Sequence, residues 1–493
     1  MLRLEEWIIE ADIASMQDAM DAGILSSEEL VEFYLARIVK IDGFLRSILE
    51  INPDALEIAR SLDQERVTQG RRGLLHGIPI LLKDNIDTAD RMHTSSGSIA
   101  LADSYAAADA YVAAQLRKAG AVLLGKTNMT EWAGYMSTDI WAGYSSRGGL
   151  VLNPYGPGEV FVGGSSSGSA VAVAANLAAA AIGTETTGSI ISPCNQNSLV
   201  GLKPTIGLVS RSGIIPISHS QDTAGPMTRT VRDAAILLGA LTGVDERDQA
   251  TLDSERYGHT DYTRFLDADY LRHARIGIPR YYYRELDAAR LAIIEDAIAV
   301  LKRSGATIID PVELPCAEVA WDWRVLQYEF KAGINRYLSQ LSEEVPVHTL
   351  GEVIAYNTQH ADLALKYGQD LLIESEGTSG SLTEQDYLDS LRMNHHMARE
   401  QGIDYALNRY KLDALLFLGN DDGDDLAARA GYPVLTVPAG YAETGVIAEG
   451  GYSTKGPQGI SFISTAFSEP MLFKLAYSYE QATQMRVVPK LNQ

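Results

Sequence analysis

Two hydroxyl-rich segments flank one short apolar stretch of this chain. The first is Gly163–Ala170 (GGSSSGSA) and the second is Gly183–Ile190 (GTETTGSI). Upstream, Gly77–Asp84 (GIPILLKD) places Lys83 at the end of an apolar run with the length of a strand. Amide hydrolysis needs a nucleophile, a proton shuttle and hydrogen-bond donors for the developing oxyanion. Serine hydroxyls and a lysine at this spacing therefore predict a serine-based catalytic site.

Lys83 qualifies as a proton shuttle only if it is neutral. Burial and neighbouring hydroxyl groups favour a neutral amine because they penalise the ammonium form. The apolar residues 78–82 that precede Lys83 are consistent with burial. The alternative is a lysine at a strand end that reaches solvent, which is the commoner situation for lysine. The nine histidines are scattered, and none lies in a motif with an obvious serine elbow.

The first segment is open to other interpretations. It suits a flexible glycine–serine loop or an anion-binding turn at a helix N-terminus. It is not a Walker A loop, because Gly168 is followed by Ser169 and Ala170 rather than by lysine. Residues 164–168 also fit the Gly-x-Ser-x-Gly nucleophile elbow, which would make Ser166 the nucleophile and would need an acid and a downstream histidine, such as His395 or His396.

The elements that must position these groups follow from hydrophobic periodicity. Residues 10–65 carry apolar positions at helical spacing, and Ser26–Glu29 is typical of a helix start. Beyond residue 74, strand-length runs alternate with helical stretches, which predicts an α/β sheet core. The expected strands are Ile78–Leu82, Ala121–Leu124, Ile276–Pro279, Ala306–Ile309, Leu412–Leu418 and Val434–Pro438, and the expected helices are Ala170–Ile182, Arg229–Leu241 and Ala288–Arg303.

This pattern predicts one large α/β catalytic domain over residues 1–493. It comprises a helical N-terminal region at about 1–65, a core at about 74–240, and a charged, aromatic, helical cap at about 318–412. The Ala170–Ile182 stretch is too short to span a bilayer, which takes about 20 apolar residues, so we expect a buried helix there.

The net charge and the cysteine content of the chain limit the classes of partner and of compartment that we expect. The formal charge is −23, from 64 acidic and 41 basic residues, which disfavours nucleic acids and anionic membranes as partners. Cys194 and Cys316 cannot form a disulfide framework, and Cys194 suits a small buried position. The N-terminus lacks the features of a signal peptide, so we expect a cytoplasmic protein. We expect no metal or organic cofactor.

A longer set of motifs resembles the amidase signature family. The resemblance runs from Gly77 to about Ala235 and includes Gly125–Asn128, Gly163–Ala170, Gly183–Ile190, Gly201–Thr205 and Gly225–Asp233. It implies the amidase signature fold, a mixed central β-sheet flanked by α-helices. It also implies a triad of a lysine, a serine with a cis peptide bond and a nucleophilic serine. Matched motif to motif, these are Lys83, Ser165 and Ser189.

The resemblance implies the remaining site residues as well. Backbone amides of Thr186, Thr187 and Gly188 would form the oxyanion hole, and glycine at 188 suits a close approach of backbone to substrate. Ser166 and Thr184 would support the triad through hydrogen bonds. The implied reaction is hydrolysis of a carboxamide with release of ammonia, through an acyl-enzyme on Ser189. A non-catalytic subunit that keeps the fold for binding is the alternative, and the intact lysine and serines speak against it.

Resemblance to one branch of the family suggests the class of substrate. Similarity to the peptide amidase branch, which deamidates peptide C-termini, lies in Gly183–Thr186, Gly207–Arg211, Gly213–Ser218, Ser220–Met227 and Tyr328–Gly333. Many family members carry arginine where this chain has Ile191, which argues against a glutamine amidotransferase of the A type. The alternative that stays open is a broad-specificity amidase for small aliphatic or aryl amides. We therefore expect a small-molecule or short peptide amide as substrate, and the sequence gives no oligomeric state.

Three segments depart from the peptide amidase pattern. Thr187 replaces an aspartate, Cys194–Asn197 replaces a more apolar stretch, and Gly419–Asp425 replaces a segment that contains Pro-Thr. The acidic run 421–425 lacks the order of an EF-hand loop and is interpreted as a solvated loop. The consecutive His395 and His396 would point to different helix faces, which disfavours a shared metal. Trp321, Trp323, Tyr328 and Phe330 would either line a pocket or serve packing.

Overall fold

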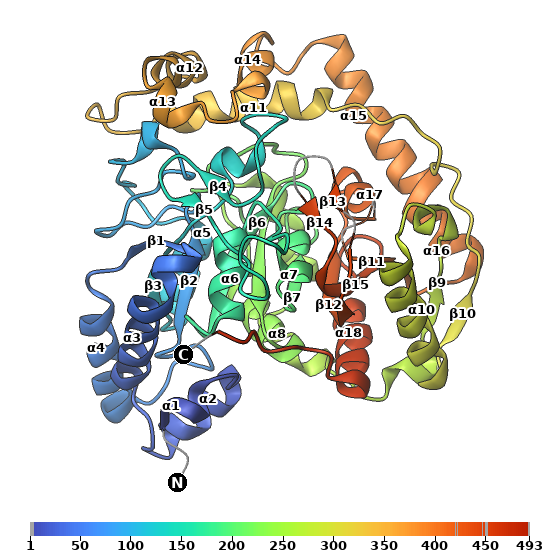
Figure 1. The fold of residues 1–493 in the computed structure, drawn as a ribbon, viewed down its shortest axis with the longest axis horizontal. Helices are drawn as coiled ribbons and strands as arrows, with labels where there is room; N and C mark the ends of the chain where they lie inside the picture. The colour runs from blue at the N-terminus through green and yellow to red at the C-terminus, as the bar shows by residue number, and fades with distance from the viewer. Residues whose placement is uncertain (1–3, 420, 422, 446, 449–451, 492–493) are drawn as a thin grey trace.

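An eleven-stranded mixed sheet forms the centre of the described part of the protein (Figure 1). The computed structural model describes residues 4–491 except 420, 422, 446 and 449–451. The strand order is β1-β3-β2-β6-β8-β7-β12-β15-β11-β9-β10. The strands are β1 (Ile48–Ile51), β2 (Pro79–Lys83), β3 (Val122–Thr127), β6 (Ala180–Glu185), β7 (Val200–Lys203), β8 (Thr223–Thr228), β9 (Arg275–Gly277), β10 (Thr307–Ile309), β11 (Ala414–Leu418), β12 (Val434–Ala442) and β15 (Gly456–Ile463). The expected α/β class with a mixed central sheet is confirmed.

The direction of neighbouring strands decides where the site forms. Strand β2 pairs in parallel with both β3 and β6, whereas β8, β7, β12 and β15 continue the sheet by antiparallel pairing. In the β2–β6 pair, Leu82 lies opposite Ile182. The carboxyl ends of these two strands therefore meet at one edge, which is where open α/β sheets bind ligands.

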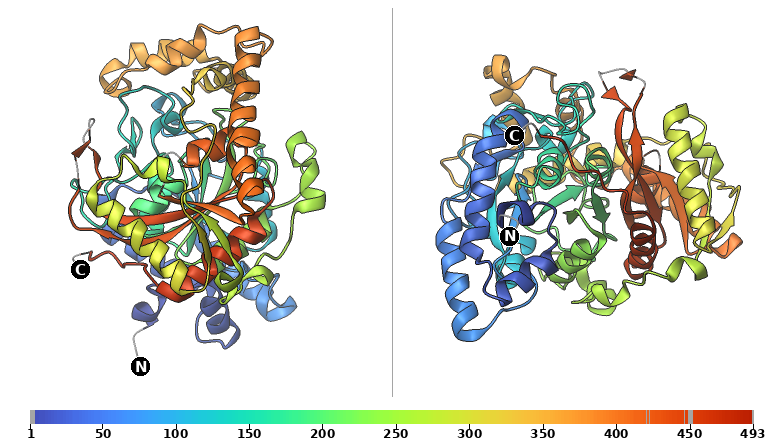
Figure 2. Two further views of the ribbon diagram at one scale, coloured as in Figure 1. Left: turned by 90° about the vertical axis from the view of Figure 1, so that its right-hand side faces the viewer. Right: turned by 60° about the horizontal axis from the view of Figure 1, so that its bottom comes forward.

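Helices flank the sheet along its whole width (Figures 1 and 2). Helix α6 packs on β6 and β8, and α8 packs on β8 and β7, whereas α10 and α18 pack on β12. The main helices outside the cap are α2 (Ile13–Asp21), α3 (Ser27–Leu45), α4 (Ala55–Gln69), α5 (Tyr111–Lys118), α6 (Ser167–Ala174), α7 (Ile191–Gln196), α8 (Val231–Leu241), α10 (Ala288–Arg303), α17 (Gly423–Ala430) and α18 (Glu469–Thr483). Among the helices of the described residues, none is both long enough and apolar enough to cross a membrane.

Residues 318–412 are largely helical, as expected. Helix α11 and the short helices after it lie above the sheet, and α15 descends from them beside α17 (Figure 1). The helices are α11 (Arg324–Leu338), α12 (Leu350–Gln359), α13 (Ala361–Ala364), α14 (Asp370–Glu376), α15 (Gln385–Ala398) and α16 (Asp404–Tyr410). We refer to the segment from residue 318 to the end of α15 as the cap.

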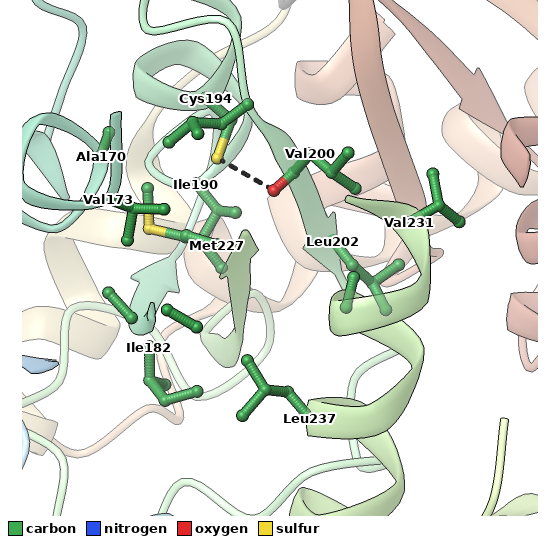
Figure 3. Close-up of a cluster of buried hydrophobic side chains, with 14 of the residues drawn as sticks. Ala170, Val173, Ile182, Ile190, Cys194, Val200, Leu202, Met227, Val231 and Leu237 are labelled. Carbon is green, nitrogen blue, oxygen red and sulfur yellow. Dashed lines mark hydrogen bonds between the residues drawn. The ribbon is translucent and has the colours of Figure 1, made fainter. Parts of the chain in front are cut away.

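The core beneath the site is built from small and branched side chains (Figure 3). Ala170 and Val173 of α6 pack with Ile182 of β6 and Met227 of β8, all fully buried. Cys194 is buried beside them, and its thiol donates a weak hydrogen bond to the Val200 carbonyl at 3.7 Å. The expectation of a buried structural cysteine is confirmed. Close packing of this kind holds the loops above it in fixed positions.

Two expectations about local structure are wrong. The stretch Ala170–Ile182 is not one helix, because α6 ends at Ala174 and β6 begins at Ala180. Asn176 adopts a left-handed conformation with φ of 56°, which breaks the helix and allows the chain to re-enter the sheet. The N-terminal region is not wholly helical either, since β1 forms the edge of the sheet beside β3. The predicted helix start is confirmed, with Ser26 and Glu29 forming a capping box.

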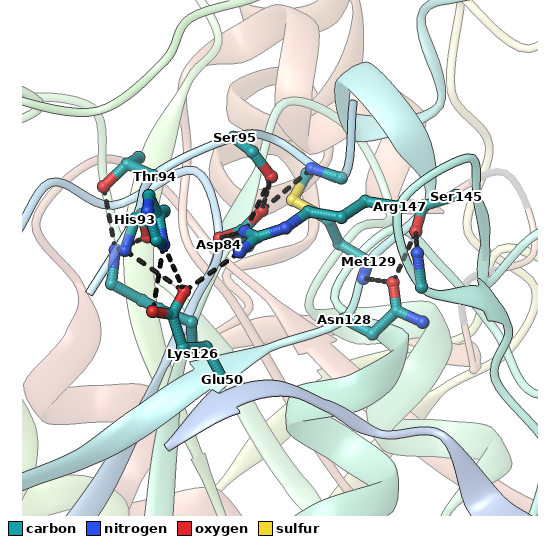
Figure 4. Close-up of polar contacts among 12 residues, drawn as sticks. Glu50, Asp84, His93, Thr94, Ser95, Lys126, Asn128, Met129, Ser145 and Arg147 are labelled. Atoms are coloured by element: carbon teal, nitrogen blue, oxygen red, sulfur yellow. Dashed lines mark hydrogen bonds and ion pairs between the residues drawn. The ribbon is translucent and has the colours of Figure 1, made fainter. Parts of the chain in front are cut away.

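A buried polar cluster fixes the chain directly after Lys83 (Figure 4). Asp84 accepts hydrogen bonds from the Ser95 hydroxyl and the Gly97 amide, and it pairs with Arg147 at 3.4 Å. Beside it, buried Lys126 donates to the Ile86 carbonyl at 2.7 Å. Buried polar groups stabilise a fold only when they are hydrogen-bonded in this way. The end of β2 is therefore held firmly on its carboxyl side.

Candidate active site

The Lys83 amine lies among three oxygen atoms at the carboxyl edge of the sheet. Its Nζ is 2.7 Å from Ser165 Oγ, 2.9 Å from Thr184 Oγ1 and 3.1 Å from the Thr184 carbonyl oxygen. The parallel register of β2 and β6, in which Leu82 lies opposite Ile182, brings Lys83 to the end of β6 that contains Thr184. Lys83 is fully buried, so the alternative of a solvent-exposed lysine is wrong. The first requirement of the predicted site, contact between the amine and a serine hydroxyl, is met.

Burial also changes the protonation of this amine. Loss of hydration lowers the pKa of Lys83 to about 7, although the negative charges of Glu185 and Asp222 oppose the shift. An ordinary lysine is almost fully protonated at neutral pH, whereas this one is divided between its two forms. A neutral amine is a base, so this side chain is able to accept a proton from a hydroxyl group.

Ser165 lies in a tight turn that leads into α6. The Gly164–Ser165 peptide bond is cis, and the Ser165 carbonyl accepts a hydrogen bond from the Thr130 amide at 3.0 Å. Gly163 has φ of 73°, and a Cβ there would lie 2.5 Å from Pro193 Cα. Only glycine fits that position, because a side chain would strike the backbone of α7 and strain the turn.

Ser189 lies between β6 and α7, and it is 7% exposed. The Ser166 amide donates to the Ser189 carbonyl at 3.1 Å, which joins the two hydroxyl-rich turns. The Ser192 amide in turn donates to the Gly188 carbonyl at 2.7 Å. The structure thus brings the turn that contains Ser165 against the turn that contains Ser189, with Lys83 bonded to the first.

The residues before Ser189 form a short turn whose side chains are all engaged. The Thr186 hydroxyl donates to Asp222 at 2.5 Å, and the Thr187 hydroxyl donates to Asp425 at 2.8 Å. Gly188 has φ of 72°, which favours glycine. We call residues 186–188 the oxyanion turn. Because carboxylates accept from both threonine hydroxyls, the backbone amides are the remaining hydrogen-bond donors of this turn.

Glu185 supports this turn from behind. Its carboxylate is buried and accepts hydrogen bonds from the amides of Ile190 and Ile191 at 2.6 and 2.9 Å. Burial raises the pKa of Glu185, while the charge of Lys203 and backbone amides that include that of Gly188 oppose the rise.

Ser166 and Thr184 lie where supporting residues were expected. The Ser166 hydroxyl donates to the Thr184 carbonyl at 3.1 Å and accepts from the Thr184 amide at 3.3 Å. Ser166 is fully buried, so its hydroxyl faces the strand rather than a substrate space. Among the described residues, no hydrogen bond or ion pair joins it to His395 or His396, which lie on α15. The geometry gives the nucleophile-elbow alternative no histidine.

A cavity of about 520 Å³ opens beside the oxyanion turn. Thr184 and Thr186 form part of its wall, and α11 of the cap contributes Gly333 and Tyr337 to it. The remaining wall combines apolar residues, which include 106–108 and 214–217, with charged side chains such as Arg211, Arg247 and Asp248. A cavity of this size and character suits an organic ligand rather than a single ion.

Several residues that build the site were not found from the sequence. Asn85 Nδ2 donates to Thr184 Oγ1 at 3.0 Å, and Asp222 accepts from the Ile217 and Ser218 amides as well as from Thr186. Asp222 falls inside the matched stretch 220–227, so its motif was visible although its role was not. Asp425 is 238 residues from Thr187, and no sequence signal links the two.

The interpretation of residues 421–425 as a solvated loop is wrong for the part that is described. Helix α17 begins at Gly423, Asp424 is buried, and Asp425 contacts the oxyanion turn. Residues 420 and 422 lie outside the described residues. A helix forms here because acidic side chains in its first turn interact favourably with the helix dipole.

The four aromatic residues that the sequence offered as pocket residues serve packing instead. Phe330 is buried against Tyr135, Tyr328 packs on Tyr387, and Trp321 and Trp323 enclose Arg429. None of these aromatic residues lines the cavity. In the described part of the chain, no group of histidine, cysteine and acidic side chains could hold a metal ion.

Similarity to known proteins shows the family to which the chain belongs. A family model described as Amidase matches residues 29–473. A probable amidase of Arabidopsis thaliana is 41% identical over 98% of this chain and 92% of its own. The A-type subunit of glutamyl-tRNA(Gln) amidotransferase from Methylobacillus flagellatus is 33% identical over 97% of this chain and 98% of its own.

Two solved structures are similar over their full length. The native peptide amidase of Stenotrophomonas maltophilia has 44% identity and a TM-score of 0.87, over 98% of this chain and 99% of that one. An amidase family protein of Bacillus anthracis has 41% identity and a TM-score of 0.91, over 99% of this chain and 94% of that one. With a buried lysine–serine pair at the edge of the same fold, this chain belongs to the amidase signature family and is an amide-hydrolysing enzyme.

Proposed function

We propose that Ser189 is the nucleophile, Ser165 the proton relay and Lys83 the base, and that the enzyme releases ammonia from the C-terminal amides of peptides. The observation that carries the mechanism is the 2.7 Å contact between Lys83 Nζ and Ser165 Oγ in a fully buried setting. We also propose that the enzyme is cytoplasmic, as expected from the sequence.

The three oxygen atoms around Lys83 can accept the three N–H groups of an ammonium, and the same arrangement also accommodates the neutral amine. A neutral amine has two N–H groups and one lone pair. Thr184 supplies two acceptors, its carbonyl and its hydroxyl oxygen, for the two N–H groups. The lone pair then faces the Ser165 hydroxyl, which donates its proton to the nitrogen. This arrangement makes Ser165 Oγ able to accept a proton from a second hydroxyl in the same step.

The reaction follows from that arrangement. The Ser189 proton passes to Ser165 Oγ, the Ser165 proton passes to Lys83, and Ser189 Oγ bonds to the amide carbon. When the tetrahedral intermediate collapses, its C–N bond breaks and nitrogen takes the proton back through Ser165, leaving as ammonia. Water then attacks the acyl ester of Ser189 and gives its proton to the same relay. The bond between the acyl carbon and Ser189 Oγ breaks, Ser189 takes the proton back, and the peptide leaves as its free acid. General-base catalysis of this kind contributes about 10²–10⁴-fold in rate.

The oxyanion turn supplies the second part of catalysis. Backbone amides of Thr186, Thr187 and Gly188 face the carbonyl oxygen as it gains charge. Fixed dipoles cost no reorganisation during the reaction, and the loss of one such donor costs about 3 kcal/mol in barrier height. The carboxylates that hold the two threonine hydroxyls keep the turn in place.

Two features favour a peptide amide over a smaller one. The cavity of about 520 Å³ beside Thr184 and Thr186 would be mostly empty with a two- or three-carbon amide. The 44% identity to a peptide amidase structure over nearly the whole chain supports the same choice. Ile191 is buried against Phe417 and Leu426, so no cation stands at this position for the carboxylate of free glutamine.

Covalent labelling tests the nucleophile. A fluorophosphonate probe is expected to label the wild-type enzyme and not Ser189→Ala, with Ser166→Ala as the matched control that keeps labelling. Labelling that persists in Ser189→Ala and disappears in Ser166→Ala would move the nucleophile to Ser166. Ammonia release from a dipeptide amide, a simple aliphatic amide and free glutamine tests the substrate. Equal or faster turnover of the simple amide would contradict a peptide amide as the preferred substrate.

A further inference from the structure

The oxyanion turn is held from two sides by carboxylates that come from distant parts of the chain. Asp222, just before β8, accepts from the Thr186 hydroxyl at 2.5 Å. Asp425, in the first turn of α17, accepts from the Thr187 hydroxyl at 2.8 Å. For Thr187, this is the only hydrogen bond in the described part of the structure. The position of Thr187, next to the turn's glycine, therefore depends on Asp425.

Asp425 is itself oriented by an arginine one helical turn later. Arg429 Nη1 lies 2.9 Å from Asp425 Oδ2, so one carboxylate oxygen binds the arginine and the other binds Thr187. The Arg429 side chain is 2% exposed, whereas that of Asp425 is 32% exposed. A nearly buried guanidinium needs a compensating charge, and this requirement fixes the carboxylate in one orientation.

Two tryptophans of the cap fix the arginine in turn. The guanidinium carbon of Arg429 lies 4.8 Å from the ring centroid of Trp321 and 4.8 Å from that of Trp323. A cation between two aromatic faces is attracted to both and loses its freedom to turn. Helix α17 also packs against α15 of the cap (Figure 1). A chain of contacts therefore leads from the cap through Arg429 and Asp425 to Thr187.

We propose that Asp425 is a positioning residue for amide hydrolysis, acting through the Thr187 hydroxyl to hold the oxyanion turn in its working conformation. The inference rests on the proposed function, in which backbone amides of that turn bind the oxyanion. The hydroxyl of Thr187 has no chemical part in the reaction. Its loss therefore affects the transition state, where the backbone amides are used, and leaves ground-state binding of the peptide unchanged.

A pair of variants at residue 187 isolates this bond. Thr187→Val removes the hydroxyl and keeps the shape of the side chain, and we expect kcat to fall about tenfold with KM unchanged, because the turn is loosened rather than removed. Thr187→Ser keeps the hydroxyl and is expected to restore kcat. An unchanged kcat in Thr187→Val would overturn the proposal, and so would an equal loss in Thr187→Ser.

Asp425→Asn tests the other partner. The asparagine keeps an oxygen but loses the charge that Arg429 orients, so kcat is expected to fall. The double variant with Thr187→Val should be no slower than Thr187→Val alone, because both changes act through one bond. Asp389→Asn, which removes the same charge from an exposed ion pair on α15, is the control and should keep wild-type activity. Independent, multiplying losses in the double variant would contradict the mechanism.

An inhibitor pair gives a readout that a merely structural role would not change. A peptide aldehyde bonds through its carbonyl carbon to Ser189 Oγ, and the aldehyde oxygen then occupies the oxyanion position. The corresponding peptide alcohol binds without forming that bond. In Thr187→Val, affinity for the aldehyde should fall by the same factor as kcat, and affinity for the alcohol should be unchanged. Equal losses for both inhibitors would show a structural effect only and would overturn the proposal.

Failure of the proposed function gives a different result. If Ser189→Ala keeps its activity and its covalent labelling, the nucleophile is elsewhere and both proposals fall. If Ser189→Ala is inactive while Thr187→Val has wild-type kcat and aldehyde affinity, only the role of Asp425 falls.

Discussion

The protonation of Lys83 predicts a specific pH dependence and a way to move it. Because burial lowers the pKa of this amine to about 7, kcat/KM of the wild-type enzyme should rise with pH through about 7 and level off above it. At pH 6 only about a tenth of the enzyme would carry a neutral lysine. Asp222, whose pKa burial raises to about 6, adds a second proton below that pH, so the profile should become steeper there.

The Thr184→Val variant is expected to shift the pKa of Lys83. It removes the hydroxyl oxygen that accepts from Lys83 at 2.9 Å and leaves the Thr184 carbonyl contact in place. A hydrogen bond to a charged group is worth about 1 kcal/mol more than one to a neutral group. Since the ammonium form loses more than the amine, the pKa of Lys83 should fall further, by about one unit. The acid limb of the profile should move to lower pH by the same amount.

The assay is ammonia release from a dipeptide amide at low substrate concentration, from about pH 5 to pH 9, because kcat/KM reports the free enzyme. Thr184→Ser keeps the hydroxyl and should keep the limb near pH 7. Lys83→Met should lose the limb and about 10²–10⁴-fold in rate. If the acid limb of the pH profile stays near pH 7 in Lys83→Met, another group is responsible for it. If the limb moves to higher pH in Thr184→Val, the hydrogen-bond argument is refuted.

Two further predictions concern the packing that supports the site. Gly163→Ala places a Cβ 2.5 Å from Pro193 Cα at a positive φ, so both activity and melting temperature should fall, and a wild-type melting curve would contradict the assigned close contact. Arg486→Ala removes the ion pair of 2.6 Å with Glu10 that ties the C-terminal segment to the N-terminal region, and stability should fall by roughly 1–3 kcal/mol in urea unfolding. Burial raises the pKa of Glu10, but Arg486 holds it below its usual value, so this contribution should be present above about pH 4.5 and fade as acid protonates Glu10. Equal stability losses at acid and neutral pH would count against the ion pair.

Local signals in the sequence determined much of this protein. The capping box at Ser26, the helix Ala288–Arg303 and six of the eleven strands of the described sheet follow from periodicity, caps and glycine positions that act over a few residues. The motifs around Lys83, Ser165 and Ser189 are equally local, because each is a short turn at the end of one element. Local rules failed at Ala170–Ile182, where the alanines favour a helix throughout, whereas the helix ends at Ala174 and the sheet takes up the chain again from Ala180.

Tertiary structure alone decided which groups touch. The lowered pKa of Lys83 depends on complete burial, because hydration is lost only when the whole sheet has formed, and the contact of this amine with Thr184 joins residues 101 positions apart. The contact between Thr187 and Asp425 joins positions 238 residues apart, and the tryptophans that hold Arg429 come from a third segment. Residue types specified the chemistry that was available, whereas the fold specified the distances and the dielectric surroundings that permit it.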